Sequence, residues 1–478
     1  MLPEHRQICD CLSGPGDVMF FRIGSSMFLM VLMAACRPGP AGPVGGNCVY
    51  RTGLTPVAQP FILPGRPGSP LEPGQTPVIP ETIGIHEYSP SKQISEYLVN
   101  LTVGGKELGF VADTGSSSLV VLGDRSICSN CESVSGVYTK SVDGMQFSHE
   151  FQVQYGSGQA TNILFSDTVQ FPCDPTDPLP KYQFGVVKNN NGLPNILGLA
   201  YPSLVQPNGL SKPILPLFDQ FLTTHLDKAQ DIIGITLCGD RPGSAIVFGG
   251  PDERITAQQR SGMIWVPIQK DPNRNTYNFY NIDALHVSVD GWKKDGSGKW
   301  VQDDFAKNTV LGDFGGAGSR GQLLTFVDTG STLNRMPVKM NNEITALLKE
   351  VNIKTGANIS PTFFDSTGLE GQAADIRADT VRLFPTFHLH VKIQSPNAGS
   401  DIASLAWPPE IYFKKNPPVA SSNRRLFSFR NGSGAYVLGQ AFLENWYVEH
   451  DRGQGRLGFY PNETLCTQDV GPAADVRP

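Results

Sequence analysis

A short apolar stretch that ends in Asp-Thr-Gly occurs twice in the chain and constrains its fold more than any other sequence feature. The first copy spans residues 110–117 (FVADTGSS) and the second spans residues 326–332 (FVDTGST). A single Asp-Thr-Gly would be ordinary turn chemistry. Two copies in matching contexts, one in each half, predict two related lobes that each supply one carboxylate, Asp113 and Asp328, to a shared site. If both acids only capped turns, the matching flanks would have no explanation.

The composition suits a folded, turn-rich β protein. Of the 478 residues, 40% are hydrophobic and 17% are charged, which allows a large core. The 51 glycines and 38 prolines favour many turns over long helices. The formal net charge is −6 and no basic block occurs, so neither nucleic acid nor an anionic membrane surface is an expected partner.

The N-terminal part of the chain has the pattern of a secretory signal. Within residues 1–36, an apolar run at 27–36 follows one arginine and ends in small residues. The run is short for a membrane-spanning helix, although a signal anchor is the alternative to a cleaved signal peptide. Residues 37–90 are rich in Pro and Gly and predict an irregular propeptide or linker. We therefore expect a secreted or extracellular protein.

Alternating apolar residues separated by glycine-rich turns begin near residue 91 and predict a mostly β fold. We expect an N-terminal lobe at residues 91–260, a C-terminal lobe at 261–465 and a polar tail at 466–478. The expected strands lie at residues 96–105, 107–121, 147–155, 160–170, 195–200, 232–238, 244–249, 263–268, 277–289, 322–328, 385–391, 436–442, 444–450 and 456–460.

A few segments depart from the strand pattern. Apolar residues at helical spacing predict short helices at residues 215–225 and 337–351. The polar, glycine-rich residues 293–320 predict a surface loop. In the first half, the hairpin at residues 147–170 has a tip of Gly156-Ser157-Gly158 preceded by Tyr155, and the second half has no counterpart.

The two acids suggest a specific chemistry. Two carboxylates held close together cannot both ionise easily, so one keeps a proton while the other acts as a base. A water between Asp113 and Asp328 can lose a proton to the ionised acid and attack a carbonyl, while the protonated acid donates to the carbonyl oxygen. This chemistry needs no metal or cofactor, and no cluster of metal-binding side chains is evident in the sequence.

The residues after each acid support this chemistry. The glycines let the backbone approach the opposite loop closely. The threonines can bond across the seam between the lobes, and the serines can donate to the outer carboxylate oxygens. These supporting residues are Thr114, Gly115 and Ser116 in the first copy, and Thr329, Gly330 and Ser331 in the second.

Five motifs together carry a family resemblance. They are residues 111–117, 327–332, 154–158, 196–202 and 437–439. By their order and spacing the chain resembles the pepsin-type aspartic endopeptidases from about Tyr97 to Tyr460. The pKa argument for a shared proton is the familiar one for that family. The resemblance implies a bilobal, mostly β fold with a few short helices and a cleft between the lobes. It also implies a monomer that binds peptide or protein substrates.

The resemblance implies roles for further residues. Tyr155, Gly156 and Ser157 would form a flap that closes over the peptide. Thr332, with Gly115 and Gly330, would contact the substrate. A disulfide between Cys128 and Cys131 would match a family disulfide in the first lobe, and Cys238 could pair with Cys466. Sequons that can accept N-linked glycans occur at Asn100, Asn358, Asn431 and Asn462.

Two positions depart from the family pattern. Val120 stands where many members have a tryptophan that holds the flap tyrosine, and Gln440 stands where animal members often have Asp. The sequence therefore predicts a secreted endopeptidase, active at acidic pH, that prefers bulky apolar residues around the cut. The alternative is a non-catalytic secreted binding or inhibitor protein on the same fold.

Overall fold

The computed structural model describes residues 50–53, 55–59 and 94–467, all within the unit Gly45–Pro478. Gaps in this description lie at residues 132–135, 156–157, 172–177, 191–192, 206–213, 225–229, 242, 316–324, 366–372, 394–400, 417–422 and 433–434. The predicted signal, most of the Pro/Gly-rich segment, most of the C-terminal tail, and Gly156 and Ser157 therefore lie outside the described residues.

The two Asp-Thr-Gly motifs lie in matching three-strand arrangements. The strands are β4 (Lys106–Asp113), β5 (Leu119–Leu122) and β9 (Ile196–Gly198), and β18 (Thr325–Val327), β19 (Asn334–Met336) and β26 (Tyr436–Leu438). β9 runs parallel to β4 and antiparallel to β5, and β26 runs parallel to β18 and antiparallel to β19. The duplication expected from the sequence is therefore present in the strand topology.

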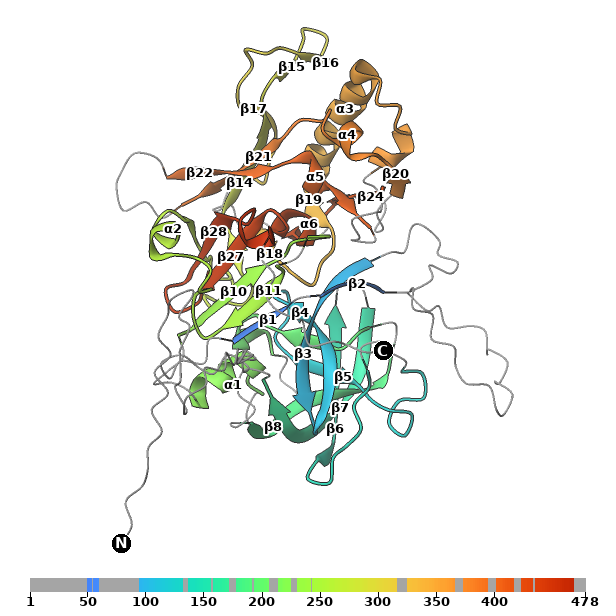
Figure 1. Cartoon of the computed structure of the whole chain (residues 1–478), viewed down its shortest axis with the longest axis vertical. Helices are drawn as coiled ribbons and strands as arrows, with labels where there is room; N and C mark the ends of the chain where they lie inside the picture. The colour runs from blue at the N-terminus through green and yellow to red at the C-terminus, as the bar shows by residue number, and fades with distance from the viewer. Residues whose placement is uncertain are drawn as a thin grey trace, which may run out of the picture. The chain divides into compact units, whose positions relative to one another are not determined.

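The sheet of the first lobe runs in the order β2-β3-β4-β9-β5-β8-β7-β6 (Figure 1). Its other strands are β2 (Thr55–Gln59), β3 (Ile94–Val103), β6 (Met145–Tyr155), β7 (Gly158–Gln170) and β8 (Leu179–Asn189). Val99 and Leu101 of β3 lie on one face, in the main hydrophobic core, because alternate residues of a strand share a face. A smaller apolar cluster contains Val120, Val153 and Ile196.

The second lobe contains further sheets and the longest helix among the described residues, α3 (Val338–Thr355). The strand before Asp328 belongs to a sheet ordered β13-β18-β26-β19-β25, and two others run β17-β14-β21-β22 and β20-β24-β23. Their bounds are β13 (Asn281–Ile282), β14 (Ala284–Val289), β17 (Thr309–Asp313), β20 (Ala373–Asp375), β21 (Phe387–Lys392), β22 (Ile402–Trp407), β23 (Phe413–Lys415), β24 (Arg424–Phe427) and β25 (Phe429–Asn431).

Helix α3 confirms the helix predicted at residues 337–351. Its buried residues, which include Ile344, Leu347 and Val351, recur at helical spacing and pack into the main core. The helix ends at Gly356, whose φ of 65° is the left-handed conformation that glycine adopts most easily. The shorter helices are α1 (Leu217–Thr224), which matches the other predicted helix, α2 (Ala257–Ser261), α4 (Ala378–Val381), α5 (Pro409–Tyr412) and α6 (Gln440–Leu443).

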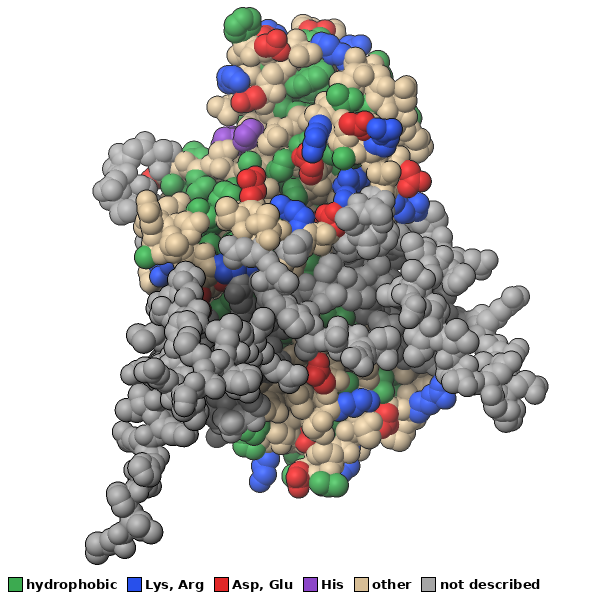
Figure 2. Space-filling view, viewed as in Figure 1, with side chains coloured by type: hydrophobic (Ala, Val, Ile, Leu, Met, Phe, Trp, Pro, Cys, Tyr) green, Lys and Arg blue, Asp and Glu red, His purple; other side chains and the backbone are tan. Residues whose placement is uncertain are grey.

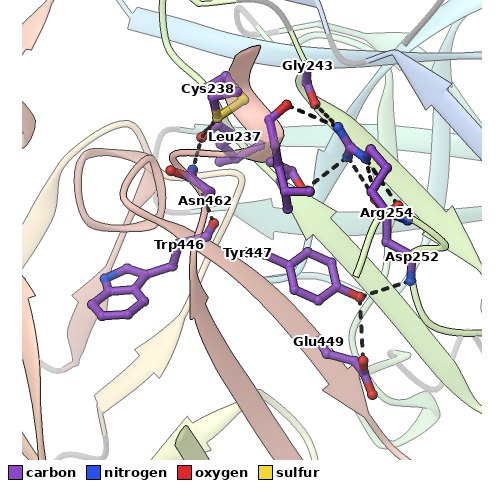
Figure 3. Close-up of polar contacts among 12 residues, drawn as sticks. Leu237, Cys238, Gly243, Asp252, Arg254, Trp446, Tyr447, Glu449 and Asn462 are labelled. Atoms are coloured by element: carbon purple, nitrogen blue, oxygen red, sulfur yellow. Dashed lines mark hydrogen bonds and ion pairs between the residues drawn. A yellow bond between two sulfur atoms is a disulfide. The ribbon is translucent and has the colours of Figure 1, made fainter. Parts of the chain in front are cut away.

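A further sheet combines strands from both halves of the chain. It runs β1-β11-β10-β27-β28-β12, and Figure 1 shows its green and red strands side by side. Its strands are β1 (Tyr50–Gly53), β10 (Ile232–Thr236), β11 (Ala245–Phe248), β12 (Ile264–Pro267), β27 (Trp446–Asp451) and β28 (Arg456–Pro461). A disulfide between Cys238 and Cys466 closes the chain beside this sheet (Figure 3). A second disulfide joins Cys128 to Cys131.

Figure 3 also bears on one of the predicted glycosylation sites. The side chain of Asn462 is fully buried, and its amide donates to the carbonyls of Leu237 at 2.8 Å and Glu444 at 3.0 Å. These bonds argue against a glycan at Asn462, because the amide would have to leave the interior. The remaining sequons differ in exposure, and Asn358 is exposed.

The buried sequon Asn100 is a poor acceptor for a similar reason. Its amide donates to Glu107 at 2.7 Å. The half-buried Asn431 accepts from the Asn341 amide at 3.0 Å. Glycosylation at Asn358 and Asn431 stays a prediction.

Two segments that the sequence predicted as irregular contain strands. Within residues 37–90, β1 pairs with β11 and β2 pairs with β3. Within residues 293–320, β17 joins the sheet through β14, and β15 (Trp292–Lys294) pairs with β16 (Trp300–Gln302). Trp292 and Trp300 are buried in the main core, and this burial outweighs the polar composition that suggested a loop.

Histidine side chains gather on the surface over β14 and β21, as Figure 2 shows. The rings of His286 and His390 stack with centroids 4.2 Å apart on these neighbouring strands. His450, in contrast, is fully buried in β27. None of the described helices is long and apolar enough to cross a membrane.

Candidate active site

Each acid of the repeated motif lies at the C-terminal end of a strand that pairs in parallel with a second strand of its lobe. Asp113 is the last residue of β4 and pairs with Gly198 of β9. Asp328 directly follows β18, and its amide donates to the carbonyl of Leu438 in β26 at 3.0 Å. Both side chains are buried. The parallel pairing with a Leu-Gly strand therefore fixes the backbone of both acids in the same way.

The two loops are bonded to each other across the seam between the lobes. The Thr114 amide donates to the Thr329 hydroxyl at 3.1 Å, and the Thr329 amide donates to the Thr114 hydroxyl at 3.0 Å. The Thr114 hydroxyl donates to the Val327 carbonyl at 3.1 Å, and the Thr329 hydroxyl donates to the Ala112 carbonyl. These reciprocal bonds lie in the interior and hold the acids at a fixed separation.

The glycines of the motif lie against the carboxyl group of the opposite lobe. A Cβ atom added to Gly115 would come within 2.7 Å of the Asp328 Cγ atom. A Cβ atom added to Gly330 would come within 2.7 Å of the Asp113 Cγ atom. Only glycine allows this approach, and the crossed contacts show that the two carboxyl groups face each other.

Each carboxyl group accepts an equivalent pair of hydrogen bonds. A backbone amide donates to Oδ1, and a serine hydroxyl donates to Oδ2, which leaves the facing sides of the carboxyl groups for each other. The donors are Gly115 at 2.8 Å and Ser116 at 2.5 Å for Asp113, and Gly330 at 2.9 Å and Ser331 at 2.6 Å for Asp328.

Electrostatics make the pair share a proton. Burial, and then the negative charge of Asp328 and a hydrogen bond with it, raise the pKa of Asp113 well above its usual value. The hydroxyl of Ser116 and the amide of Gly115 act in the opposite direction, because they donate to the ionised form. The pair therefore keeps one proton at a pH where isolated carboxyl groups would both be ionised.

Tyr155 lies at the end of β6, directly opposite Gly158 at the hairpin tip. Its ring packs against the small apolar cluster that contains Val120. Burial, and then the charge of Asp113, raise the pKa of Tyr155, whereas the Ser116 hydroxyl acts in the opposite direction. The Ser116 hydroxyl, which donates to Asp113, therefore lies close to the Tyr155 hydroxyl. The tyrosine thus has a polar neighbour although Val120 cannot donate.

Polar residues beside the Leu-Gly strands complete the support. The Gln440 amide donates to the Thr329 carbonyl at 2.8 Å, and the Gly439 amide donates to the Asn334 side chain at 2.9 Å. In the first lobe, the Asn195 amide donates to the Gly109 carbonyl at 3.0 Å. The sequence marked Gln440 only as a departure and did not signal Asn195 or Asn334, whose partners lie far away in the chain.

The other predicted site residues are placed as follows. Thr332 is buried, and its carbonyl accepts from the Ala441 amide at 3.2 Å, beside the start of α6. Cys128 and Cys131 lie in the same apolar cluster as Val120. In the part of the chain that is described, no group of three His, Cys, Asp or Glu side chains is arranged to hold a metal ion.

These observations agree with comparisons to known proteins. The family model of eukaryotic aspartyl proteases matches residues 96–462, and the chain belongs to this family. It is 24% identical to pepsin A of Suncus murinus, over 77% of this chain and 81% of that protein. It is also 24% identical to pepsin A of Gallus gallus, over 77% of this chain and 84% of that protein. Aspartic protease 6 of Caenorhabditis elegans is 36% identical over 29% of this chain and 40% of its own length.

Proposed function

We propose that this protein is an aspartic endopeptidase in which Asp113 and Asp328 are the catalytic residues. The observation that carries this proposal is the pair of facing carboxyl groups, each with its own amide and hydroxyl donor. A protein that only bound peptides would not need the crossed glycine contacts or the shared proton.

The mechanism follows from the shared proton. A water held between the carboxyl groups gives a proton to the ionised acid and attacks the carbonyl carbon of the scissile bond. The acid of the pair that holds the proton donates to the carbonyl oxygen where negative charge develops. The same acids then supply the proton that the leaving amine needs.

We expect the flap to close the active site during the reaction. Tyr155, with Gly156 and Ser157, covers the bound peptide, and the proximity of its hydroxyl to Ser116 couples the flap to Asp113. The substrates are peptides or proteins with bulky apolar residues around the cut, and the protein acts as a secreted monomer at acidic pH. The apolar run at residues 27–36 supports secretion.

A digest of a defined peptide library by the purified protein between pH 3 and pH 7 tests the proposal. We expect cleavage that is strongest in acid, is blocked by a statine-containing peptide and disappears in Asp113→Asn. Asp143→Asn, which changes an exposed acid outside both Asp-Thr-Gly motifs, is the matched control and keeps full activity. A wild-type protein that binds the statine peptide but leaves every library peptide intact would instead be a non-catalytic binding protein.

A further inference from the structure

Two arginines lie side by side in the sheet that leads to Asp328. In that sheet Phe326 of β18 pairs with Val437 of β26, Val437 pairs with Arg335 of β19, and Arg335 pairs with Arg430 of β25. Paired residues on neighbouring strands point to the same face of a sheet. The four side chains therefore form one row across four strands.

The row lies on the face of the sheet that carries the catalytic acid. Asp328 is two residues beyond Phe326, and its bond to Leu438 continues the strand pairing, so both side chains project from the same face. Strands are about 4.8 Å apart, so Arg335 stands about 10 Å across the sheet from the strand of Asp328. An extended peptide advances about 3.4 Å per residue, so this gap corresponds to two to four residues of substrate.

The charges of this arginine pair are only partly balanced by the described residues around them. Arg335 is half-buried and has no ion pair or side-chain hydrogen bond within the described part of the chain. Arg430 is only 2% exposed, and its Nη1 atom donates to the carbonyls of Asp365 at 3.1 Å and Phe429. Its Nε and Nη2 atoms have no hydrogen-bond partner.

Burial and mutual repulsion of the two positive charges therefore destabilise the folded protein. Burial lowers the pKa of Arg430 to about 10, against a smaller opposing effect of the Asp365 carboxylate. Like charges directly opposite each other in neighbouring strands are destabilising, and a buried charge without a partner is costly. Both costs would fall if an anion bound beside the pair.

The first lobe shows that the fold does not require this charge. Its equivalent row runs from Val111 through Ile196 to Val120, with the same strand pairings as Phe326, Val437 and Arg335 in the second lobe. Val120 and Ile196 of that row belong to the apolar cluster against which Tyr155 packs. Arg335 is thus the positively charged counterpart of a residue that lies beneath the flap.

We propose that Arg335, with the charge of Arg430 behind it, binds the carboxylate of an acidic side chain in the substrate, two to four residues from the cleaved bond. The inference rests on the proposed function and adds a specificity to it. Arg335 is the contact residue because it is the accessible member of the pair. Arg430 raises the local positive potential and makes the subsite selective for anions over neutral groups.

Paired peptides test the proposal. Each pair has the same apolar residues at the cut and carries Glu or Gln at one position, up to four residues on either side. At pH 5.5, the wild-type protein should cleave the Glu peptide about tenfold more efficiently than its Gln partner at one position, the difference that a hydrogen bond between charged groups supplies. The preference should fade toward pH 3.5, because the glutamate carboxyl has an ordinary pKa near 4.3.

Arg335→Gln should bring the Glu peptide down to the rate of the Gln peptide and leave the Gln peptide unchanged. Arg335→Lys should keep a partial preference, and Arg335→Glu should reverse it toward a Lys-containing peptide. The matched control is Lys339→Gln, which removes an exposed charge from the nearby α3 and should keep the full preference. Equal losses for both peptides in Arg335→Gln would show a structural role for Arg335 and overturn the proposal.

The test separates failure of this inference from failure of the proposed function. Cleavage of the Gln peptides reports the endopeptidase activity, and the ratio between Glu and Gln peptides reports the subsite. If the wild-type protein cleaves neither peptide, the same pair is measured by fluorescence anisotropy, where the Glu peptide should bind about tenfold more tightly. A wild-type ratio near one at every position, in cleavage and in binding, would overturn the proposal.

Discussion

The two serines of the repeated motif provide the sharpest test of how the site holds its proton. Ser116 donates to Asp113 at 2.5 Å and Ser331 donates to Asp328 at 2.6 Å, so the serines are equivalent toward the acids. Toward the flap they differ, because Ser116 is the serine whose hydroxyl acts on the pKa of Tyr155. Ser116→Ala therefore removes a bond to an acid together with the contact to Tyr155. Ser331→Ala removes only the equivalent bond to the other acid.

The sign and size of the effect of Ser116→Ala follow from that bond. The hydroxyl stabilises the ionised form of Asp113 and so lowers its pKa, and its loss should raise the pKa further. A hydrogen bond to a charged group contributes about 1.5 to 3 kcal/mol, and one pKa unit corresponds to about 1.4 kcal/mol. Because the carboxyl keeps its bond to the Gly115 amide, we expect a shift of about one unit.

The assay is the pH dependence of kcat/KM with one good peptide. The active form holds one proton on the pair, and activity falls as the pH rises through the raised pKa of the pair. In Ser116→Ala this alkaline limb should move about one unit to higher pH, and kcat/KM at the optimum should also fall about tenfold because Tyr155 loses its polar neighbour. Ser116→Thr keeps a hydroxyl and should restore both properties.

Ser331→Ala is the matched control. It removes the same kind of donor from the pair, but it should leave the flap tyrosine in place and preserve most of the activity at the optimum. An alkaline limb that stays in place or moves to lower pH in Ser116→Ala would refute the assigned electrostatics. Equal losses in the two alanine variants would refute the special link between Ser116 and Tyr155.

Other substitutions test the packing around the site. Gly330→Ala should reduce kcat/KM at least a hundredfold, because the new Cβ would overlap the Asp113 carboxyl group. The variant should stay folded, so its binding of a hydrophobic dye should stay as low as that of the wild-type protein. Full activity would contradict the crossed contacts. Lys414→Met should lower the free energy of unfolding by about 3 to 5 kcal/mol in a denaturant titration, since it leaves a buried Glu444 without its ion pair. The same change at Lys188, whose ion pair is half exposed, should cost under about 1 kcal/mol, and equal costs would refute the assignment. Cys238→Ser should cost about 3 to 5 kcal/mol, because its disulfide closes a long loop; unchanged stability would contradict this.

The sequence predicts the parts of the site that are local in the chain. The acids, threonines, glycines and serines follow one another within each motif, so their residue types already indicate their geometry. The same holds for α3, where apolar spacing alone identifies the buried face. Local patterns could also place Tyr155 at a hairpin tip, because a glycine-rich turn interrupts two alternating strands.

Contacts between distant segments could not be predicted in this way. The row that joins Arg335 to Arg430 depends on the pairing of β19 with β25, and nothing near either residue indicates that pairing. The Gln440 side chain reaches Thr329 only because β26 lies beside β18. The buried groups of the segment at residues 293–320 (Trp300, Leu311 and Phe314) are scattered among polar residues instead of forming an alternating run, so its composition suggested a loop.

The central claim is that the two facing carboxyl groups hydrolyse peptides together, and its most direct test is the rate of peptide cleavage by Asp328→Asn. The substitution keeps the size and shape of the side chain but removes the charge from the pair. We predict that kcat/KM at acidic pH falls at least a thousandfold, while the protein remains folded by circular dichroism and still binds a statine-containing peptide. Acidic cleavage at the wild-type rate by the folded variant would contradict the account.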